Sequence, residues 1–571
     1  MSDENLKEHP ESYDAIVIGS GISGGWAAKE LCENGLKTLV LERGRNVKHI
    51  EDYPTMNMDP WDFKYHGEKE QKDLERQPKQ NRSYVGRPES KHWFVDDLKH
   101  PYNEIKRFDW IRGYHVGGRS LMWARQSYRL SDIDFGANKK DGHGVDWPVR
   151  YKDISPWYDK VEEFIGVSGQ KEGLPQLPDG KFSDPMELNC VELDLQKKIK
   201  NNFNDRLLTI GRSAHKTGNA VHEGRSNCQY RNRCVRGCPF GGYFSSNSST
   251  LPAAERTGNM HLRADSIAYE IVYDDKTGLA SGVKVIDAIT KEKTFFRTGI
   301  VFSCASSMAS AGILLQSKSK RFPNGLGNDS GELGHNIMDH PMSAGASAVV
   351  EGFDDLYYKG RRPNGFYIPR FRNIDEKSTQ KEFIRGYGFQ GGASRLNWKR
   401  AVGEMSFGAD LKDDLLSPGP WRVGMGGFGE CLPYHENKVT LNYDKLDEWG
   451  LPTLDFDAEY KENEDKMRDD MREQAIAMLK AAGYKNVKGF KGKATPGIGI
   501  HEMGTARMGY DPKTSVLNKN NQIHTVPNVY VTDGSFMTSS ACQNPSLTYM
   551  AFTARAANHA AQEFKKNKKN G

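Results

Sequence analysis

The segment from Tyr13 to Glu42, YDAIVIGSGISGGWAAKELCENGLKTLVLE, constrains the fold of this chain more than any other stretch. Its apolar start, Tyr13–Ile18, predicts a buried parallel strand. Gly19, Gly21 and Gly24 follow in G-x-G-x-x-G spacing. The first glycine permits a tight turn, the second lets backbone N–H groups approach a pyrophosphate, and the third lets a helix pack on the strand. The segment therefore predicts a Rossmann-like β-α-β unit that binds a dinucleotide.

The rest of this unit indicates which dinucleotide is bound. A helix is predicted from about Gly24 to Asn34, and its positively polarised N-terminus and Ser23 are expected at the phosphates. A second strand, Lys37–Leu41, ends at Glu42, whose carboxylate can accept hydrogen bonds from an adenosine ribose. Because an acid at this position disfavours a 2′-phosphate, the sequence predicts FAD or NAD rather than NADP.

Length, charge and cysteine content limit the remaining possibilities. A chain of 571 residues is long enough for several domains, and its formal net charge of +5 gives no reason to expect nucleic acid as a partner. No apolar run approaches the ~18 residues that a membrane helix needs. Twelve mostly polar residues precede the first strand, so no secretory signal is expected. Eight cysteines are too few for a disulfide framework. These features predict a soluble protein without a membrane span of its own.

A second glycine-rich turn lies in GYHVGGRSLMWARQSYRLSDIDF, which spans Gly113–Phe135. Gly117, Gly118 and Ser120 resemble the second motif of the glucose–methanol–choline (GMC) oxidoreductases, a loop that lies along the flavin in that family. The resemblance implies FAD as the cofactor. Met122 stands where some relatives carry a flavin-linked histidine, so the resemblance also implies that the FAD is held without a covalent bond.

The resemblance to the GMC family is strongest near the C-terminus, in GIGIHEMGTARMG and NVYVTDGSFMTSSACQNPSLTYMAFTARAA. There His501 matches the catalytic base and Asn544 the second active-site position. Asp533 and Gly534 match the turn that contacts the FAD pyrophosphate and ribityl chain, and Ile267 matches a backbone contact to adenine. The resemblance implies alcohol oxidation, in which a neutral imidazole takes the hydroxyl proton and the flavin takes the hydride.

Other segments resemble the family as well. In LGHNIMDHP, residues 333–341, His340 is interpreted as a structural position. Four residues of the region expected to roof the flavin have two open interpretations, as contacts to a sugar or as core residues: Gln390, Arg395, Trp398 and Tyr434.

Three cysteines cluster in SNCQYRNRCVRGCPFGG, at Cys228, Cys234 and Cys238. The C-x3-C-P half of this run is typical of iron–sulfur ligation, and the arginines between the cysteines are expected to stabilise thiolates. Three interpretations remain open: an iron–sulfur cluster, a zinc site completed by a residue such as His222, or cysteines without a ligand. Three ligands favour a 3Fe–4S cluster. The spacing is similar to that in the catalytic subunits of bacterial FAD-dependent glucose dehydrogenases and glucoside 3-dehydrogenases.

The whole pattern predicts an α/β protein with a Rossmann-like FAD-binding domain, discontinuous in sequence, and a substrate domain built on a broad antiparallel sheet. The expected parts are FAD-binding residues 1–135, substrate-domain residues 136–215, cysteine-segment and FAD-binding residues 216–344, substrate-domain residues 345–493, and FAD-binding residues 494–571. Residues 46–109 are interpreted as an excursion over the surface, either a lid or a partner-binding segment.

The resemblance implies an FAD-dependent sugar dehydrogenase that oxidises a secondary hydroxyl, specifically the 3-hydroxyl of a glucoside. Electrons would leave the flavin through the cluster to a cytochrome c or another external acceptor. The alternative is an oxidase that uses oxygen, with structural or zinc-binding cysteines. Enzymes of the first kind are exported folded with a small subunit that carries the signal, so a periplasmic location by co-export is expected, with a cytoplasmic location as the alternative.

Overall fold

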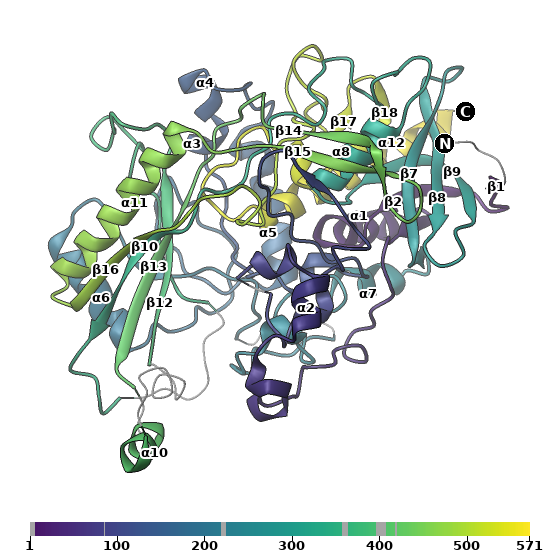
Figure 1. Ribbon diagram of the computed structural model, residues 1–571. Coiled ribbons are helices and arrows are strands. Elements are labelled where there is room, and N and C mark those ends of the chain that lie inside the picture. Colours follow the sequence, from purple (N-terminus) through teal and green to yellow (C-terminus); the bar gives the residue numbers. More distant parts are fainter. Residues whose placement is uncertain are drawn as a thin grey trace.

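The computed structural model describes residues 6–84, 86–218, 224–356, 364–395, 407–416 and 419–570. Two lobes lie side by side in Figure 1. The lobe on the right contains the N-terminal strand, α1 (Ile22–Glu33) and the C-terminal helix α12 (Ser546–Asn570). The lobe on the left is an antiparallel sheet with α11 (Glu462–Ala481) lying along it.

The right-hand lobe is the predicted Rossmann-like domain. Its strands follow the order β17-β18-β9-β2-β3-β6, and β2 pairs in parallel with both β3 and β9. Strands from three distant parts of the chain therefore share one sheet, as predicted for a discontinuous FAD-binding domain. The bounds are β2 Tyr13–Ile18, β3 Thr38–Leu41, β6 Met260–Arg263, β9 Lys293–Ser303, β17 Gln522–Ile523 and β18 Val526–Val531.

Helices and an antiparallel extension complete this lobe. Helix α1 packs between α12 and α7 (Thr250–Glu255), and it begins at Ile22, two residues before the predicted start. Ile16, Trp26 and Phe552 are among the fully buried side chains of its core. The other elements of this lobe are β1 Lys7–Glu8, β7 Ser266–Asp274, β8 Leu279–Asp287 and α8 Ser307–Gln316. The chain also forms three short helices, α2 Gln71–Arg76, α3 Asp132–Phe135 and α4 Ala137–Asp141.

The left-hand lobe is a six-stranded sheet in the order β16-β10-β13-β12-β11-β5. Burial alternates along β13 (Trp421–Gly429), so that its apolar side chains Trp421, Val423 and Met425 share one buried face. Met467, Met471 and Met478 recur at helical spacing along α11 and are also buried, so the helix covers the sheet. The remaining bounds are β5 Thr209–Ile210, β10 Ala344–Val350, β11 Phe366–Ile368, β12 Tyr387–Arg395, β16 Lys485–Lys491 and α10 Gly408–Leu416.

Three regions differ in detail from the expected organisation. The hairpin of β14 (Lys438–Leu446) and β15 (Pro452–Asp457) pairs with β4 (Asn103–Glu104) in a separate small sheet, not with the broad one. Within 136–215, α5 (Tyr151–Ile165) packs on α12 whereas α6 (Cys190–Asn202) packs on α11, so this segment contributes to both lobes.

The excursion at 46–109 also differs from a purely superficial segment. It buries Trp93, Tyr102 and Phe108, and it contributes His100 and Pro101 to the wall of the large cavity. It is therefore part of the structure around the site. Across the residues that the structure describes, no helix combines the length and apolar character of a membrane span.

Candidate active site

A cavity of about 550 Å³ lies where the predicted motifs meet. Most of its wall comes from the Rossmann-like lobe, while Gln390 on β12 and Phe428 on β13 come from the broad sheet. The predicted cofactor and catalytic residues on its wall are Gly19, Gly21, Ser23, Glu42, Gly118, Ser120, Ile267, His501, Asp533, Gly534 and Asn544. The predicted residues Gly24 and Gly117 lie behind this wall.

The first glycine turn forms one end of the cavity. Helix α1 begins after Gly21 without a side-chain cap, so backbone N–H groups of its first turn remain available to a phosphate. Gly24 is required for packing, since a β-carbon there would overlap the carbonyl of Gly19. This is the close approach of helix to strand that the motif predicts.

Ser20, which was not predicted as a site residue, connects two residues that were, Gly117 and Glu42. Its Oγ accepts a hydrogen bond from the Gly117 amide at 2.9 Å and donates one to Glu42 Oε2 at 2.5 Å. The Gly44 amide donates to Glu42 Oε1 at 3.0 Å. Burial raises the pKa of Glu42, and the hydrogen bonds from Ser20 and Gly44 oppose that rise. The acid at the strand end is thus oriented before any ribose binds.

The second glycine turn rests on Asn247. Gly117 has a φ of +87°, and a β-carbon there would overlap the Asn247 amide. Asn247 in turn donates to the carbonyl of Val47 at 2.7 Å. Ser120 donates to the Gly117 carbonyl at 2.6 Å, which closes the turn. Gly117 therefore shapes the loop from behind, and Gly118 and Ser120 present it to the cavity.

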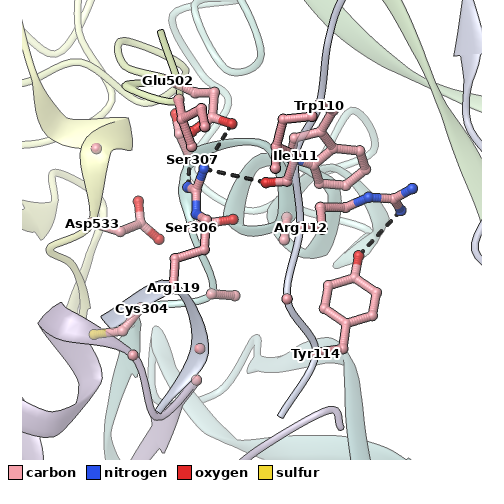
Figure 2. A pocket seen from close by; sticks show the side chains of 18 of the residues that line it. Trp110, Ile111, Arg112, Tyr114, Arg119, Cys304, Ser306, Ser307, Glu502 and Asp533 are labelled. Carbon is pink, nitrogen blue, oxygen red and sulfur yellow. Dashed lines mark hydrogen bonds and ion pairs between the residues drawn. The ribbon is translucent and has the colours of Figure 1, made fainter. Parts of the chain in front are cut away.

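Asp533 also lines the cavity, and Figure 2 shows it near Ser306 and Ser307 at the start of α8. Its carboxylate accepts hydrogen bonds from Ser310 Oγ at 2.5 Å and from the Ser535 amide at 2.9 Å. Burial raises its pKa, while these bonds act in the opposite direction. Arg119 crosses the cavity in the same view and pairs with Glu502 at 2.8 Å. Arg119 was not predicted as a site residue, although it lies inside the second glycine-rich turn, between Gly118 and Ser120.

His501 and Asn544 meet at the end of the cavity nearest the broad sheet. Asn544 Nδ2 lies 3.4 Å from His501 Nε2, and Asn544 Oδ1 accepts a hydrogen bond from Gln390 Nε2 at 2.5 Å. Since Oδ1 is the acceptor, the amide presents its N–H₂ to the imidazole. Burial, reinforced by His340 and Arg119, lowers the pKa of His501 well below its usual value, so the ring is neutral near physiological pH.

The turn that carries Asp339 and His340 holds the loop before His501. The Asp339 carboxylate accepts hydrogen bonds from the amides of Gly497, Gly499 and His501 at 2.7, 2.9 and 3.0 Å. Ile500, a β-branched residue, has a φ of 59°, a conformation that persists only when its surroundings enforce it. Asp339 therefore fixes where the imidazole enters the cavity.

Of the four predicted sugar contacts, Gln390 lines the cavity. Arg395 instead donates to the carbonyls of Gly419 and Asp354, and the Tyr434 hydroxyl donates to Glu464, so neither side chain lines the cavity. Both side chains were chosen for their chemical type alone, and both satisfy backbone or carboxylate partners elsewhere. Trp398 lies outside the described residues.

The three clustered cysteines line a second cavity, of about 30 Å³, together with His215 and Tyr243. All three are half-buried and unbridged, and Cys234 Sγ lies 3.8 Å from His215 Nε2. Burial raises the pKa of Cys228 to about 11, so in this state it is a thiol. Within the described ranges, no group of three or more His, Cys, Asp and Glu residues is arranged to hold one metal ion. His222 lies outside those ranges.

The arginines of the cysteine loop act differently from expectation. Arg231 and Arg236 donate to the carbonyls of Met56 and Met58 at 2.7 Å, and Arg233 pairs with Asp59. These hydrogen bonds and the one ion pair fasten the loop to the 46–109 segment, so the three guanidinium groups bind partners other than the thiols.

The cysteine loop also reaches the large cavity. Val235, which follows Cys234 in the chain, lines the 550 Å³ cavity, whereas Cys234 lines the small one. The Trp93 indole donates to the Val235 carbonyl at 2.9 Å and holds it there. The two cavities therefore lie next to each other, with adjacent residues of the chain, Cys234 and Val235, on their walls.

These walls fit FAD: an uncapped helix start for the pyrophosphate, an oriented acid at the end of β3 for the ribose, and a neutral imidazole beside an amide where a substrate would meet the flavin ring. Together with the fold, they define an FAD-dependent oxidoreductase. Family models described as GMC oxidoreductase match residues 13–342 and 433–553. The chain belongs to the GMC oxidoreductase family, and it acts on CH–OH groups with FAD as its cofactor.

Relatives and solved structures agree with this assignment. The chain is 29% identical over 576 residues to 2-methyl-1,2-propanediol dehydrogenase of Mycolicibacterium austroafricanum, which covers 97% of this chain and 96% of that protein. It is 25% identical to the fructose dehydrogenase large subunit of Gluconobacter japonicus, over 99% and 100% of the two chains. The fold is similar to that of a formate oxidase, with a TM-score of 0.60 and 13% identity over 97% and 99% of the two chains.

Proposed function

We propose that this protein is an FAD-dependent sugar dehydrogenase that oxidises a secondary hydroxyl, the 3-hydroxyl of a glucoside, to a ketone. The observation that carries the proposal is the neutral His501 imidazole 3.4 Å from the oriented Asn544 amide, at the cavity end where Gln390 of the broad sheet also lies.

The chain's own residues supply proton transfer and orientation. His501 takes the hydroxyl proton of the substrate on its cavity-facing nitrogen, and its low pKa keeps that nitrogen available. The Asn544 N–H₂ donates a hydrogen bond to the same substrate oxygen and so directs the carbinol C–H. FAD, when bound, accepts the hydride that leaves this carbon. The lost proton and hydride together convert the CH–OH group to a carbonyl.

A sugar substrate is supported by similarity and by the polar cavity end. Fructose dehydrogenase is among the relatives, and a C-glycoside 3-oxidase of Arthrobacter globiformis is 30% identical over 154 residues, 27% of this chain and 29% of that protein. Gln390 is a polar side chain of the roof that reaches the reaction end. The identification of the 3-hydroxyl rests on the resemblance to glucoside 3-dehydrogenases.

The cysteine loop supports a dehydrogenase. Three thiols that line one cavity next to the flavin cavity suit a 3Fe–4S cluster that would receive electrons and pass them to a cytochrome c. An oxidase that uses oxygen is the second candidate. It is favoured by relatives named oxidases and by the lack of a single-ion ligand group among the residues described.

We extend the dehydrogenase proposal to its partners and location. A small subunit would carry the chain into the periplasm, where a cytochrome acceptor would be available. The alternative is a cytoplasmic enzyme that acts alone. Fractionation of native cells, followed by co-purification of associated subunits, separates these two arrangements.

Anaerobic mixing tests the proposed function. Methyl glucoside, glucose, cellobiose, 2-methyl-1,2-propanediol and cholesterol are each mixed with the holoenzyme, and flavin bleaching is recorded. Methyl glucoside is expected to bleach the flavin fastest, and NMR of its product should show a ketone at position 3. Bleaching by the diol or the sterol alone, or formation of a lactone at the anomeric carbon, contradicts the proposal.

A further inference from the structure

His340, interpreted from the sequence as a structural position, contacts the catalytic histidine directly. The two Nδ1 atoms of His340 and His501 lie 2.9 Å apart, and the two rings meet at an angle of 75°. His340 is fully buried and lies outside the cavity wall. A 2.9 Å contact between two ring nitrogens is a hydrogen bond only if one nitrogen carries a proton and the other a lone pair.

The other side of His340 determines which nitrogen carries the proton. His340 Nε2 lies 3.4 Å from the carbonyl oxygen of Ser540, which can only accept. The proton of a neutral His340 ring is therefore on Nε2, and Nδ1 holds the lone pair. Burial lowers the pKa of His340 to about 4, so the ring is neutral near physiological pH.

The position of the proton on His340 determines the position of the proton on His501. Because His340 Nδ1 accepts, His501 Nδ1 must donate, and the neutral His501 ring then has its lone pair on Nε2. That nitrogen faces the Asn544 N–H₂ at 3.4 Å. Gln390 fixes the Asn544 amide in the orientation that places N–H₂, not oxygen, on this side. A single consistent order of donors and acceptors thus links His340, His501, Asn544 and Gln390.

We propose that His340 is a positioning residue, which keeps His501 in the tautomer with its proton on Nδ1 and its lone pair on Nε2 toward the substrate. The inference rests on the proposed role of His501 as the base. Without an acceptor at Nδ1, the His501 proton is free to occupy Nε2, and that tautomer cannot accept the hydroxyl proton at the cavity.

Two replacements separate this role from simple packing. His340→Phe fills the volume but offers no acceptor, whereas His340→Asn retains a carbonyl oxygen near the position of Nδ1. In anaerobic stopped-flow experiments with excess substrate, His340→Phe is expected to lower the limiting rate of flavin reduction about 10–100-fold, which is less than the roughly 10²–10⁴-fold expected for loss of the base itself. His340→Asn is expected to restore most of that loss. The substrate concentration for half-maximal rate and the FAD spectrum should change little.

His559→Phe is the matched control. Both ring nitrogens of His559 are hydrogen-bonded, to Asn520 and to Tyr530, but the residue lies on α12 away from the cavity wall. Its replacement is expected to leave the limiting rate unchanged. A His340→Phe rate equal to wild type, or a His340→Asn rate as low as that of His340→Phe, overturns the proposal.

Nitrogen NMR of the wild-type holoenzyme measures the tautomer of His501 directly, so it tests the proposal even if His340→Phe does not fold. With ¹⁵N-histidine, and with the His501 signals identified by their loss in His501→Asn, Nδ1 should show the shift of a protonated nitrogen and Nε2 that of an unprotonated one. The opposite pattern overturns the proposal. Failure of the proposed function is distinguishable, because the compound that bleaches the wild-type flavin and the position of the new carbonyl are measured independently of the tautomer of His501.

Discussion

The two cavities of this protein differ in how their walls are organised. The 550 Å³ cavity is formed by residues from many parts of the chain, and its polar side chains Glu42, Asp533 and Asn544 are held by protein hydrogen bonds. The 30 Å³ cavity is formed almost entirely by one loop, and the arginines of that loop bind the neighbouring segment instead of the thiols. The polar groups of the large cavity are oriented by hydrogen bonds of the fold, whereas the small cavity gathers three half-buried thiols. The predictions below test this difference.

The largest expected effect concerns the small cavity. Replacement of Cys228, Cys234 and Cys238 by serine is expected to abolish iron and acid-labile sulfide in anaerobically purified protein, because the three thiolates are the ligands of the proposed cluster. Bound FAD and flavin reduction by substrate should persist, since Val235 is the residue of this loop on the wall of the flavin cavity and most of that wall comes from other parts of the chain. Replacement of the buried Cys32, Cys431 and Cys542 provides the control for loss of thiols in general.

Absence of iron and sulfide from the wild-type protein contradicts the cluster and favours the oxidase. Loss of FAD together with the iron would show that the two cavities depend on each other more than their walls indicate.

The next effect concerns buried histidines around the large cavity. Burial lowers the pKa of His115 and of His340 to about 4. The unfolded chain takes up these protons near pH 6.5 whereas the folded chain does not, so the stability present above pH 6.5 is lost as the pH falls toward 4. Each group contributes about 3 kcal/mol to this loss.

Denaturant unfolding of the holoenzyme from pH 7.5 to 4.5 measures this dependence. The denaturant concentration at the midpoint of unfolding is expected to fall steadily as the pH falls. In His115→Phe this fall should be smaller, because unfolding takes up as much as one proton less. A midpoint that is independent of pH over this interval would show that these histidines are protonated in the fold.

A smaller effect is expected from a single methyl group at the first glycine turn. In Gly24→Ala the new β-carbon overlaps the Gly19 carbonyl, so helix α1 must shift away from the pyrophosphate site. Overpacking of about 1–3 kcal/mol predicts FAD binding weakened about 10–100-fold. Gly426→Ala is the matched control, because a β-carbon there has no neighbour closer than 3.9 Å. Flavin fluorescence titration of the apoprotein compares the two, and equal affinities would contradict this role of Gly24.

Local features of the sequence predicted more of this fold than features that depend on distant residues. The β-α-β unit was predictable because glycine spacing, strand periodicity and a terminal acid are local features, and each has one backbone consequence. The Gly24 packing and the Glu42 position follow from them. The antiparallel sheet was predictable from alternation, but the separate pairing of β14 and β15 with β4 depends on Asn103 and Glu104, which carry no strand pattern.

Side-chain partners across long sequence distances were not predictable. Ser20 lies 97 residues from Gly117, and His340 lies 161 residues from His501, so their hydrogen bonds appear only in the folded chain. Arg395 and Tyr434 show the converse, because residue type suggested a sugar contact and the fold satisfied both groups elsewhere. The position of Ser20 between the first two glycines was the available signal for its role.

The most direct test of the account is anaerobic reduction of the bound flavin by methyl glucoside in His501→Ala. The account predicts an FAD spectrum like that of wild type and a limiting reduction rate lower by about 10²–10⁴-fold, because the hydroxyl proton has no acceptor as the hydride leaves. His524→Ala, whose ring bonds Ser515 away from the cavity wall, should reduce at the wild-type rate. A His501→Ala rate within a few-fold of wild type would contradict the assignment of His501 as the base.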